Sequence, residues 1–154
     1  MTGTALEIIS WLYRQDNKEQ KFEIKEYRQK RSLNANAYAW TLIGKIADLV
    51  GNTKEEVYKD FIQHKGIYKI ITMNKEAVST FITAWGNQGL GWICETSQNN
   101  ISGLIDVVAY YGTSSYNTKQ MANFIDYVVQ ECNNLGIETK SKEEIDSLLK
   151  EWNR

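Results

Sequence analysis

The residues that most clearly invite a chemical interpretation lie between Arg28 and Trp40, in the stretch RQKRSLNANAYAW. Arg28, Lys30 and Arg31 place three cations within four residues, directly before a segment whose apolar spacing predicts a helix. The N–H groups of a first helical turn, with a dipole equivalent to about half a positive charge, favour an anion. Ser32 is followed three positions later by alanine, so no carboxylate closes a capping box. The sequence therefore predicts a phosphate site at this helix start.

The first turns of the same helix carry groups that suit nucleic acid. Asn34 and Asn36 offer amides that can hydrogen-bond to phosphate, sugar or base edges, and Trp40 lies one turn beyond Asn36 on the same side. An aromatic ring beside cations suits a single strand, because stacking contributes ~1–3 kcal/mol per base. With Lys45, residues 27–47 carry a charge of +4, whereas the remaining residues sum to −5. Two alternatives stay open: the cations are simply solvated, or Trp40 is buried with its apolar stripe.

A second candidate surface is the stretch YYGTSSYNTK, residues 110–119. Its polar and aromatic side chains are Tyr110, Tyr111, Thr113, Ser114, Ser115, Tyr116 and Lys119. Hydroxyl groups just before a helix start suit phosphate, and the tyrosines offer surfaces for base stacking. The alternative is an ordinary capped loop between a strand and a helix.

Residues that would support catalysis are scarce. His64 is the only histidine and has no nearby paired carboxylate, so it is expected to be a surface residue, and neither a Cys-His nor a Ser-His-Asp set can be built on it. The stretch GNQGLG, residues 86–91, lacks the preceding strand and following helix of a phosphate-binding fingerprint. The best metal-binding candidates are the carboxylates of Glu95, Asp106, Asp126 and Glu131. We therefore expect no enzyme and no cofactor or metal.

The elements that must position these residues follow from capping signals and periodicity. Four capping pairs predict helix starts: Thr4 with Glu7, Thr53 with Glu56, Asn117 with Gln120, and Ser141 with Glu144. Two further helices are predicted from about residue 32 to 50 and from residue 74 to 85. Strands are predicted within 21–28 and 66–74, with a hairpin over 91–98 and 103–112. This order predicts a single α+β domain over residues 1–154, with a small, largely antiparallel sheet and about six helices.

The bulk composition limits the class of protein. A 42% hydrophobic and 12% aromatic content is that of a folded chain, and no apolar run approaches the ~20 residues that span a bilayer. The N-terminal residues lack the basic region and cleavage site of a secretory signal. Cys94 and Cys132 show no metal or redox spacing and are expected to be reduced core thiols. We expect a cytoplasmic protein that does not bind membranes.

Two of these segments resemble a known family. The stretch RQKRSLNANAYAWTLIGKIADLV is similar to the R-x-R-S-L-x-x-N-x-x-x-W segment of the Orf/NinB family of bacteriophage recombination proteins. The stretch YYGTSSYNTKQMANFIDYVVQECNNLGIET is similar to the strand–loop–helix near the C-terminus of those proteins and of relatives in phages of Gram-positive bacteria. The matching positions are Arg31, Ser32, Leu33, Asn36, Trp40, Thr113 and Ser114. The chain departs from the family pattern by having no arginine in TSSYN, residues 113–117.

The resemblance implies a recombination mediator from a phage or prophage. Such proteins are homodimers that bind single-stranded and gapped DNA without sequence preference and help a recombinase to displace single-strand-binding protein. On this interpretation the DNA-binding residues are Arg28, Lys30, Arg31, Ser32, Asn34, Asn36, Trp40, Lys45, Thr113, Ser114, Ser115, Tyr116 and Lys119. Two alternatives remain: a metal-dependent nuclease or junction resolvase built on Asp106, and an interaction module for acidic protein tails.

Overall fold

A computed structural model describes residues 3–15, 19–24 and 33–152. The chain divides into two units, residues 1–30 and residues 31–154. In the first unit, α1 (Ala5–Tyr13) begins at Thr4, whose side chain and that of Glu7 form the predicted capping box. Residues 21–24 form no strand, contrary to expectation, and residues 25–28 of the predicted strand lie outside the described residues. The ring of Phe22 meets Trp11 edge-on at 5.2 Å. Alternating residues need a partner strand to pair their backbone groups, and the described strands pair only with one another.

The second unit carries the predicted α+β fold. Its helices and strands are α2 (Leu33–Val50), α3 (Lys54–Lys65), β1 (Tyr68–Asn74), the 3₁₀ turn η1 (Lys75–Ala77), α4 (Val78–Gly86), β2 (Cys94–Gln98), β3 (Leu104–Tyr110), the 3₁₀ turn η2 (Thr113–Ser115), α5 (Thr118–Asn134) and α6 (Lys142–Glu151). The predicted capping boxes at Thr53, Asn117 and Ser141 all form. The helix predicted to start at residue 74 begins later, since α4 starts at Val78. The side chain of Asn74 makes no capping hydrogen bond to η1 or to α4.

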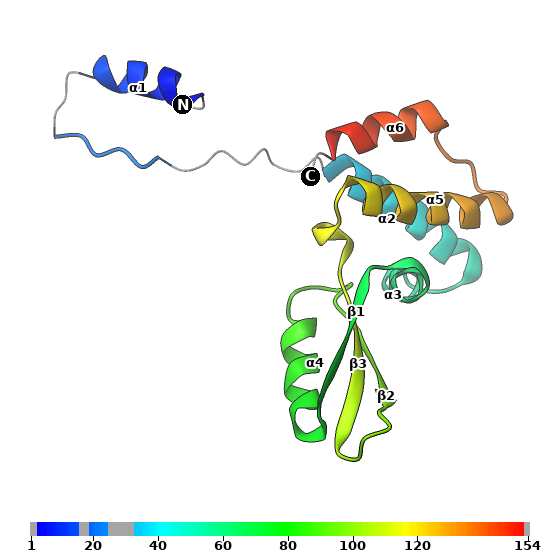
Figure 1. Ribbon diagram of the computed structural model, residues 1–154. Coiled ribbons are helices and arrows are strands. Elements are labelled where there is room, and N and C mark those ends of the chain that lie inside the picture. The colour runs from blue at the N-terminus through cyan, green and yellow to red at the C-terminus, as the bar shows by residue number, and fades with distance from the viewer. Residues whose placement is uncertain (1–2, 16–18, 25–32, 153–154) are drawn as a thin grey trace. The chain divides into compact units, whose positions relative to one another are not determined.

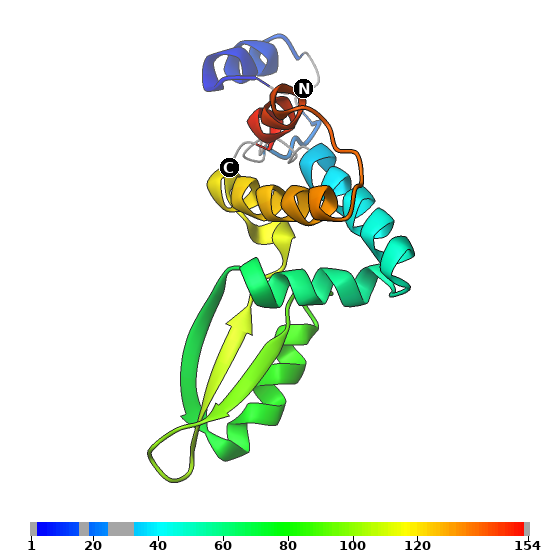
Figure 2. The same ribbon diagram turned by 90° about the vertical axis from the view of Figure 1, so that its right-hand side faces the viewer.

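The sheet is small and antiparallel, as the sequence predicts. Its strand order is β1-β3-β2, with Tyr68 opposite Tyr110 and Cys94 opposite Ala109. In both views the sheet and α4 lie together at one end of the second unit, and α2, α5 and α6 lie at the other, with α3 between them (Figures 1 and 2). The indole N–H of Trp85 on α4 donates to the carbonyl oxygen of Tyr110 at 2.8 Å, which ties this helix to β3.

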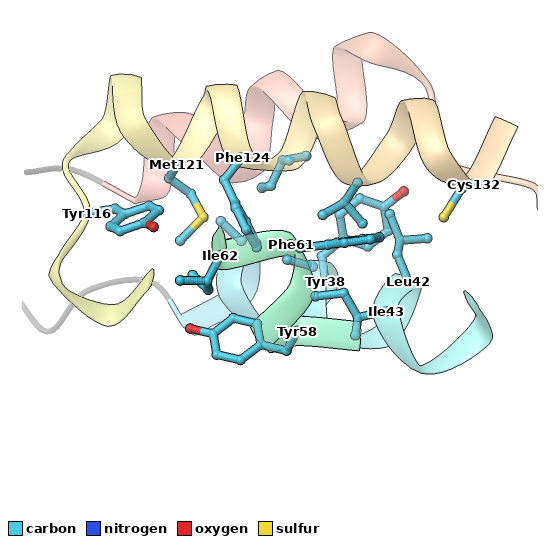
Figure 3. Packing of buried hydrophobic residues seen from close by; sticks show 14 of the residues in the cluster. Tyr38, Leu42, Ile43, Tyr58, Phe61, Ile62, Tyr116, Met121, Phe124 and Cys132 are labelled. Atoms are coloured by element: carbon cyan, nitrogen blue, oxygen red, sulfur yellow. The ribbon is translucent and has the colours of Figure 1, made fainter. Parts of the chain in front are cut away.

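The main core lies among α2, α3, α5 and α6 (Figure 3). The apolar stripes predicted for α2 account for much of it, since Leu42, Ile43 and Ile46 are buried. Cys132 is buried on α5 as expected, Cys94 is half-buried on β2, and both thiols are free. Because the core holds α2 against α3 and α5, it fixes the loop that leads into α5 relative to the start of α2.

Candidate functional site

The two candidate surfaces meet at one buried hydrogen-bond network. The hydroxyl of Thr113, in η2, donates to Asn36 Oδ1 on α2 at 2.8 Å, although 77 residues separate them. The backbone N–H of Thr113 donates to the Tyr58 hydroxyl on α3 at 3.0 Å. The two hydroxyl oxygens lie 2.9 Å apart, and because the single proton of Thr113 is directed at Asn36, Tyr58 is the donor between them. Tyr58 thus joins α3 to η2 directly, and to Asn36 on α2 through Thr113.

Trp40 belongs partly to the core and partly to the surface. Its ring centroid lies 4.5 Å from that of Tyr58, with the two planes tilted by 34°. The side chain is half-buried against the core, so Trp40 is not fully buried with its apolar stripe, and stacking on bases stays a prediction. Packing against Tyr58 also fixes the orientation of the Trp40 ring, one helical turn after Asn36.

The structure corrects the expectation for Thr113 and Tyr116. Each is only 1% exposed, so neither side chain is presented to a ligand. The Tyr116 hydroxyl accepts the Ile67 N–H at 3.0 Å and donates to the Tyr111 carbonyl at 3.3 Å, and desolvation on burial raises the pKa of Tyr116 to about 12. A tyrosine buried in this way is a core residue and offers no face for base stacking. Both residues instead fix the loop in place.

The other residues of the loop are more accessible. Ser114 and Lys119 are exposed, and Ser115 is half-buried with its hydroxyl donating to the Gly112 carbonyl at 2.8 Å. Lys119 lies in the first turn of α5, two residues after the Asn117 cap. Of the predicted contacts in this loop, Ser114 and Lys119 are therefore the ones that face solvent.

Several predicted contact residues are not placed. Arg28, Lys30, Arg31 and Ser32 lie outside the described residues, as does the side chain of Asn34. Arg31 and Ser32 immediately precede α2 in the sequence. Whether they form an anion site with the α2 start stays a prediction.

Lys45 does not share the face of α2 that carries Asn36. It lies nine residues after Asn36 on α2, which at 3.6 residues per turn is half a rotation away. Its side chain lines a separate cavity between α2 and α6, together with Glu138, Lys140 and Glu144. The charge sum that grouped Lys45 with the cations before α2 reflected sequence proximity alone.

The structure adds a pocket that the sequence interpretation did not assemble. It is lined by Lys69 of β1, Trp92 and Tyr111, with Ser115 and Gln120 from the loop and the first turn of α5. Tyr111 and Ser115 belong to the second candidate stretch, but Lys69 and Trp92 come from residues far along the chain. The sequence held one signal for this pocket, which is Trp92 directly after GNQGLG. The glycine before it, Gly91, allows the backbone to lie close to Gly112.

Two of the four carboxylates proposed as metal ligands, Asp106 and Glu95, accept hydrogen bonds within the fold. Oδ1 of Asp106 accepts from Thr72 at 2.6 Å and from Asn99 at 2.8 Å, and these two hydrogen bonds lower the pKa of Asp106. Glu95 accepts from Gln63 and from the Tyr110 hydroxyl. Within the part of the chain that the structure describes, no group of three or more His, Cys, Asp and Glu side chains is arranged to hold a metal ion.

Comparisons of the chain with protein-family models, curated proteins and solved structures give no match. No helix within the described residues has the length and apolar character needed to span a membrane.

Proposed function

We propose that this protein binds single-stranded or gapped DNA without sequence specificity and acts as an accessory of phage recombination in the host cytoplasm, where it assists recombinase loading. The observation that carries the proposal is the 2.8 Å hydrogen bond from Thr113 to Asn36. It joins the two segments whose sequences resemble the Orf/NinB family. The bond holds together two segments that lie 77 positions apart in the sequence, as a shared binding role requires.

The chemistry around this junction supports a nucleic-acid ligand. Trp40 is half-buried on Tyr58, and Ser114 and Lys119 are exposed on the loop that Thr113 anchors. A partly exposed aromatic ring and a surface cation are the two groups that a sequence-independent single-strand site combines. The three cations before α2, Arg28, Lys30 and Arg31, would add the phosphate contacts.

The test is a fluorescence-anisotropy titration of a labelled oligonucleotide single strand at two salt concentrations. We expect affinity to fall steeply with salt, because each neutralised phosphate releases counterions. Replacing Arg28, Lys30 and Arg31 together by alanine should weaken binding to every sequence and reduce the slope of log K against log salt by about 2. A matched control replaces three exposed lysines elsewhere, Lys59, Lys142 and Lys150, and should leave the slope near that of the parent.

Three outcomes would overturn the proposal. The first is an absent or salt-insensitive binding signal. The second is cleavage of the oligonucleotide with Mg²⁺ or Mn²⁺ that is lost in Asp106→Asn, which would favour a nuclease. An acidic peptide that binds more tightly than DNA in the same assay would point instead to a protein-interaction module. Mass determination in solution tests the expected homodimer, and added single-strand-binding protein and recombinase test the expected partners.

A further inference from the structure

The aromatic pocket at the junction of the sheet and the helices has the composition of a ligand site. Its cavity of about 420 Å³ falls within the ~300–1,000 Å³ typical of small-molecule sites. Trp92 and Tyr111 form its aromatic walls, and both are half-buried, so part of each ring stays open to the cavity. Ser115 and Gln120 contribute neutral polar groups, and Lys69 contributes the charge.

The rings of Trp92 and Tyr111 pack against each other and against Trp85. The ring centroids of Trp92 and Tyr111 lie 5.3 Å apart, and Trp85 contacts both of them edge-on, at 5.2 and 5.1 Å. Trp85 is itself fixed by its hydrogen bond to the Tyr110 carbonyl. Such edge-to-face packing leaves the rings in one arrangement, so little conformational freedom is lost when a flat ligand stacks on them.

The charge of the pocket comes from one lysine. Lys69 is exposed, and its Nζ lies 5.3 Å from the ring centroid of Trp85 and 5.9 Å from that of Tyr111. Lysine is a compact point charge that binds phosphate well. Flat apolar surfaces beside a single cation match a planar aromatic group that is linked to an anion, which is the chemistry of a nucleotide within a strand.

The pocket is also continuous with the surface proposed to bind DNA. Within the three residues of η2, Thr113 bonds to Asn36 on α2 whereas Ser115 lines the pocket. The indole of Trp92 packs against Gly112, where an added Cβ would lie 2.6 Å from Nε1. One short turn therefore separates the α2 contact from the aromatic walls.

We propose that this pocket receives one unstacked base of a bound single strand, which stacks on Trp92 or Tyr111 while Lys69 contacts a neighbouring phosphate. The inference rests on the proposed function and deepens it by assigning a base-binding position. Stacking on these rings carries no sequence preference, because every base presents a π face.

A photocrosslinking experiment on the unaltered protein tests this directly. An oligothymidine strand that carries 5-iodouracil is bound and irradiated, and the crosslinked peptide is identified by mass spectrometry. We expect the crosslink at Trp92 or Tyr111. A crosslink confined to residues outside the pocket lining, such as Trp40, overturns the base-binding position while the proposed function stands. If the strand does not bind at all, the proposed function fails and the inference fails with it.

Affinity measurements with matched variants give a second test. Trp92→Leu should weaken binding of oligothymidine by about 5- to 150-fold, the equivalent of one lost stacking contact, and leave binding of an abasic strand of the same length unchanged. Phe81→Leu is the control, because Phe81 stacks on Trp85 at 5.5 Å without lining the pocket. Equal affinity of Trp92→Leu, Tyr111→Leu and the parent for oligothymidine, with all three folded by circular dichroism, overturns the inference.

The lysine contact has its own control. Lys69→Met keeps an unbranched apolar side chain over the rings and should reduce the slope of log K against log salt by about 0.7, the value for one phosphate on a single strand. Lys75→Met removes an exposed charge from η1, outside this pocket, and should leave the slope unchanged. An unchanged slope in Lys69→Met overturns the phosphate contact.

Discussion

Replacing Thr113 by valine would test whether the buried hydroxyl holds the loop against α2 and α3. Valine keeps the shape of threonine but removes the oxygen that accepts from Tyr58 and donates to Asn36. Asn36 is half-buried, so water can replace its lost donor, whereas Tyr58 is 4% exposed and its proton would have no partner. One buried donor left unpaired costs about 1–3 kcal/mol, which is the expected loss in free energy of unfolding.

Urea unfolding of four proteins would isolate this interaction: the parent, Thr113→Val, Tyr58→Phe and the double variant. In the double variant the unpaired tyrosine proton is gone, so the two losses should not add, and the coupling energy should be about 1 kcal/mol or more. Thr113→Ser keeps the hydroxyl and should lose only the contribution of one methyl group, about 0.8 kcal/mol. Additive losses, or a Thr113→Val stability within about 0.5 kcal/mol of the parent, would refute the network as a stabilising element.

Two further predictions concern close packing and burial. Gly91→Ala would place a Cβ 2.6 Å from the Tyr58 hydroxyl and 2.9 Å from Gly112 Cα, so thermal unfolding should show a loss of about 1–3 kcal/mol in the free energy of unfolding. Gly86→Ala is the control and should not destabilise the protein, because the nearest neighbour of its Cβ lies at 3.8 Å. Burial raises the pKa of Tyr116 to about 12 from an ordinary value of about 10, so the unfolded chain loses this proton first. The stability present below pH 10 should therefore fall as the pH rises toward 12. Its share of that slope is about 1.4 kcal/mol per pH unit and should disappear in Tyr116→Phe; an unchanged slope in unfolding measured across this range would contradict it.

The sequence alone determined the local features of this protein. Each capping box, such as Thr53 with Glu56 or Ser141 with Glu144, is complete within four consecutive residues, so its geometry needs no distant partner. Gly51 directly follows α2 and Gly136 follows the Leu135 cap of α5, both with positive φ, the conformation that favours glycine after a helix end. The hairpin of β2 and β3 and the apolar stripes of α2 follow equally from short-range periodicity.

Only the tertiary structure decided which candidate residues share a surface. Thr113 and Tyr116 look like accessible loop residues in the sequence, yet their burial depends on Tyr58 and Ile67, about 50 residues away. Lys45 lies on the opposite side of α2 from Asn36, because a helix turns about 100° per residue and nine residues separate them. A sum of charges along the sequence takes no account of this rotation. The folded chain also brings Lys69 next to Trp85 and Trp92. No short sequence pattern connects these residues, so their proximity could not be predicted from the sequence.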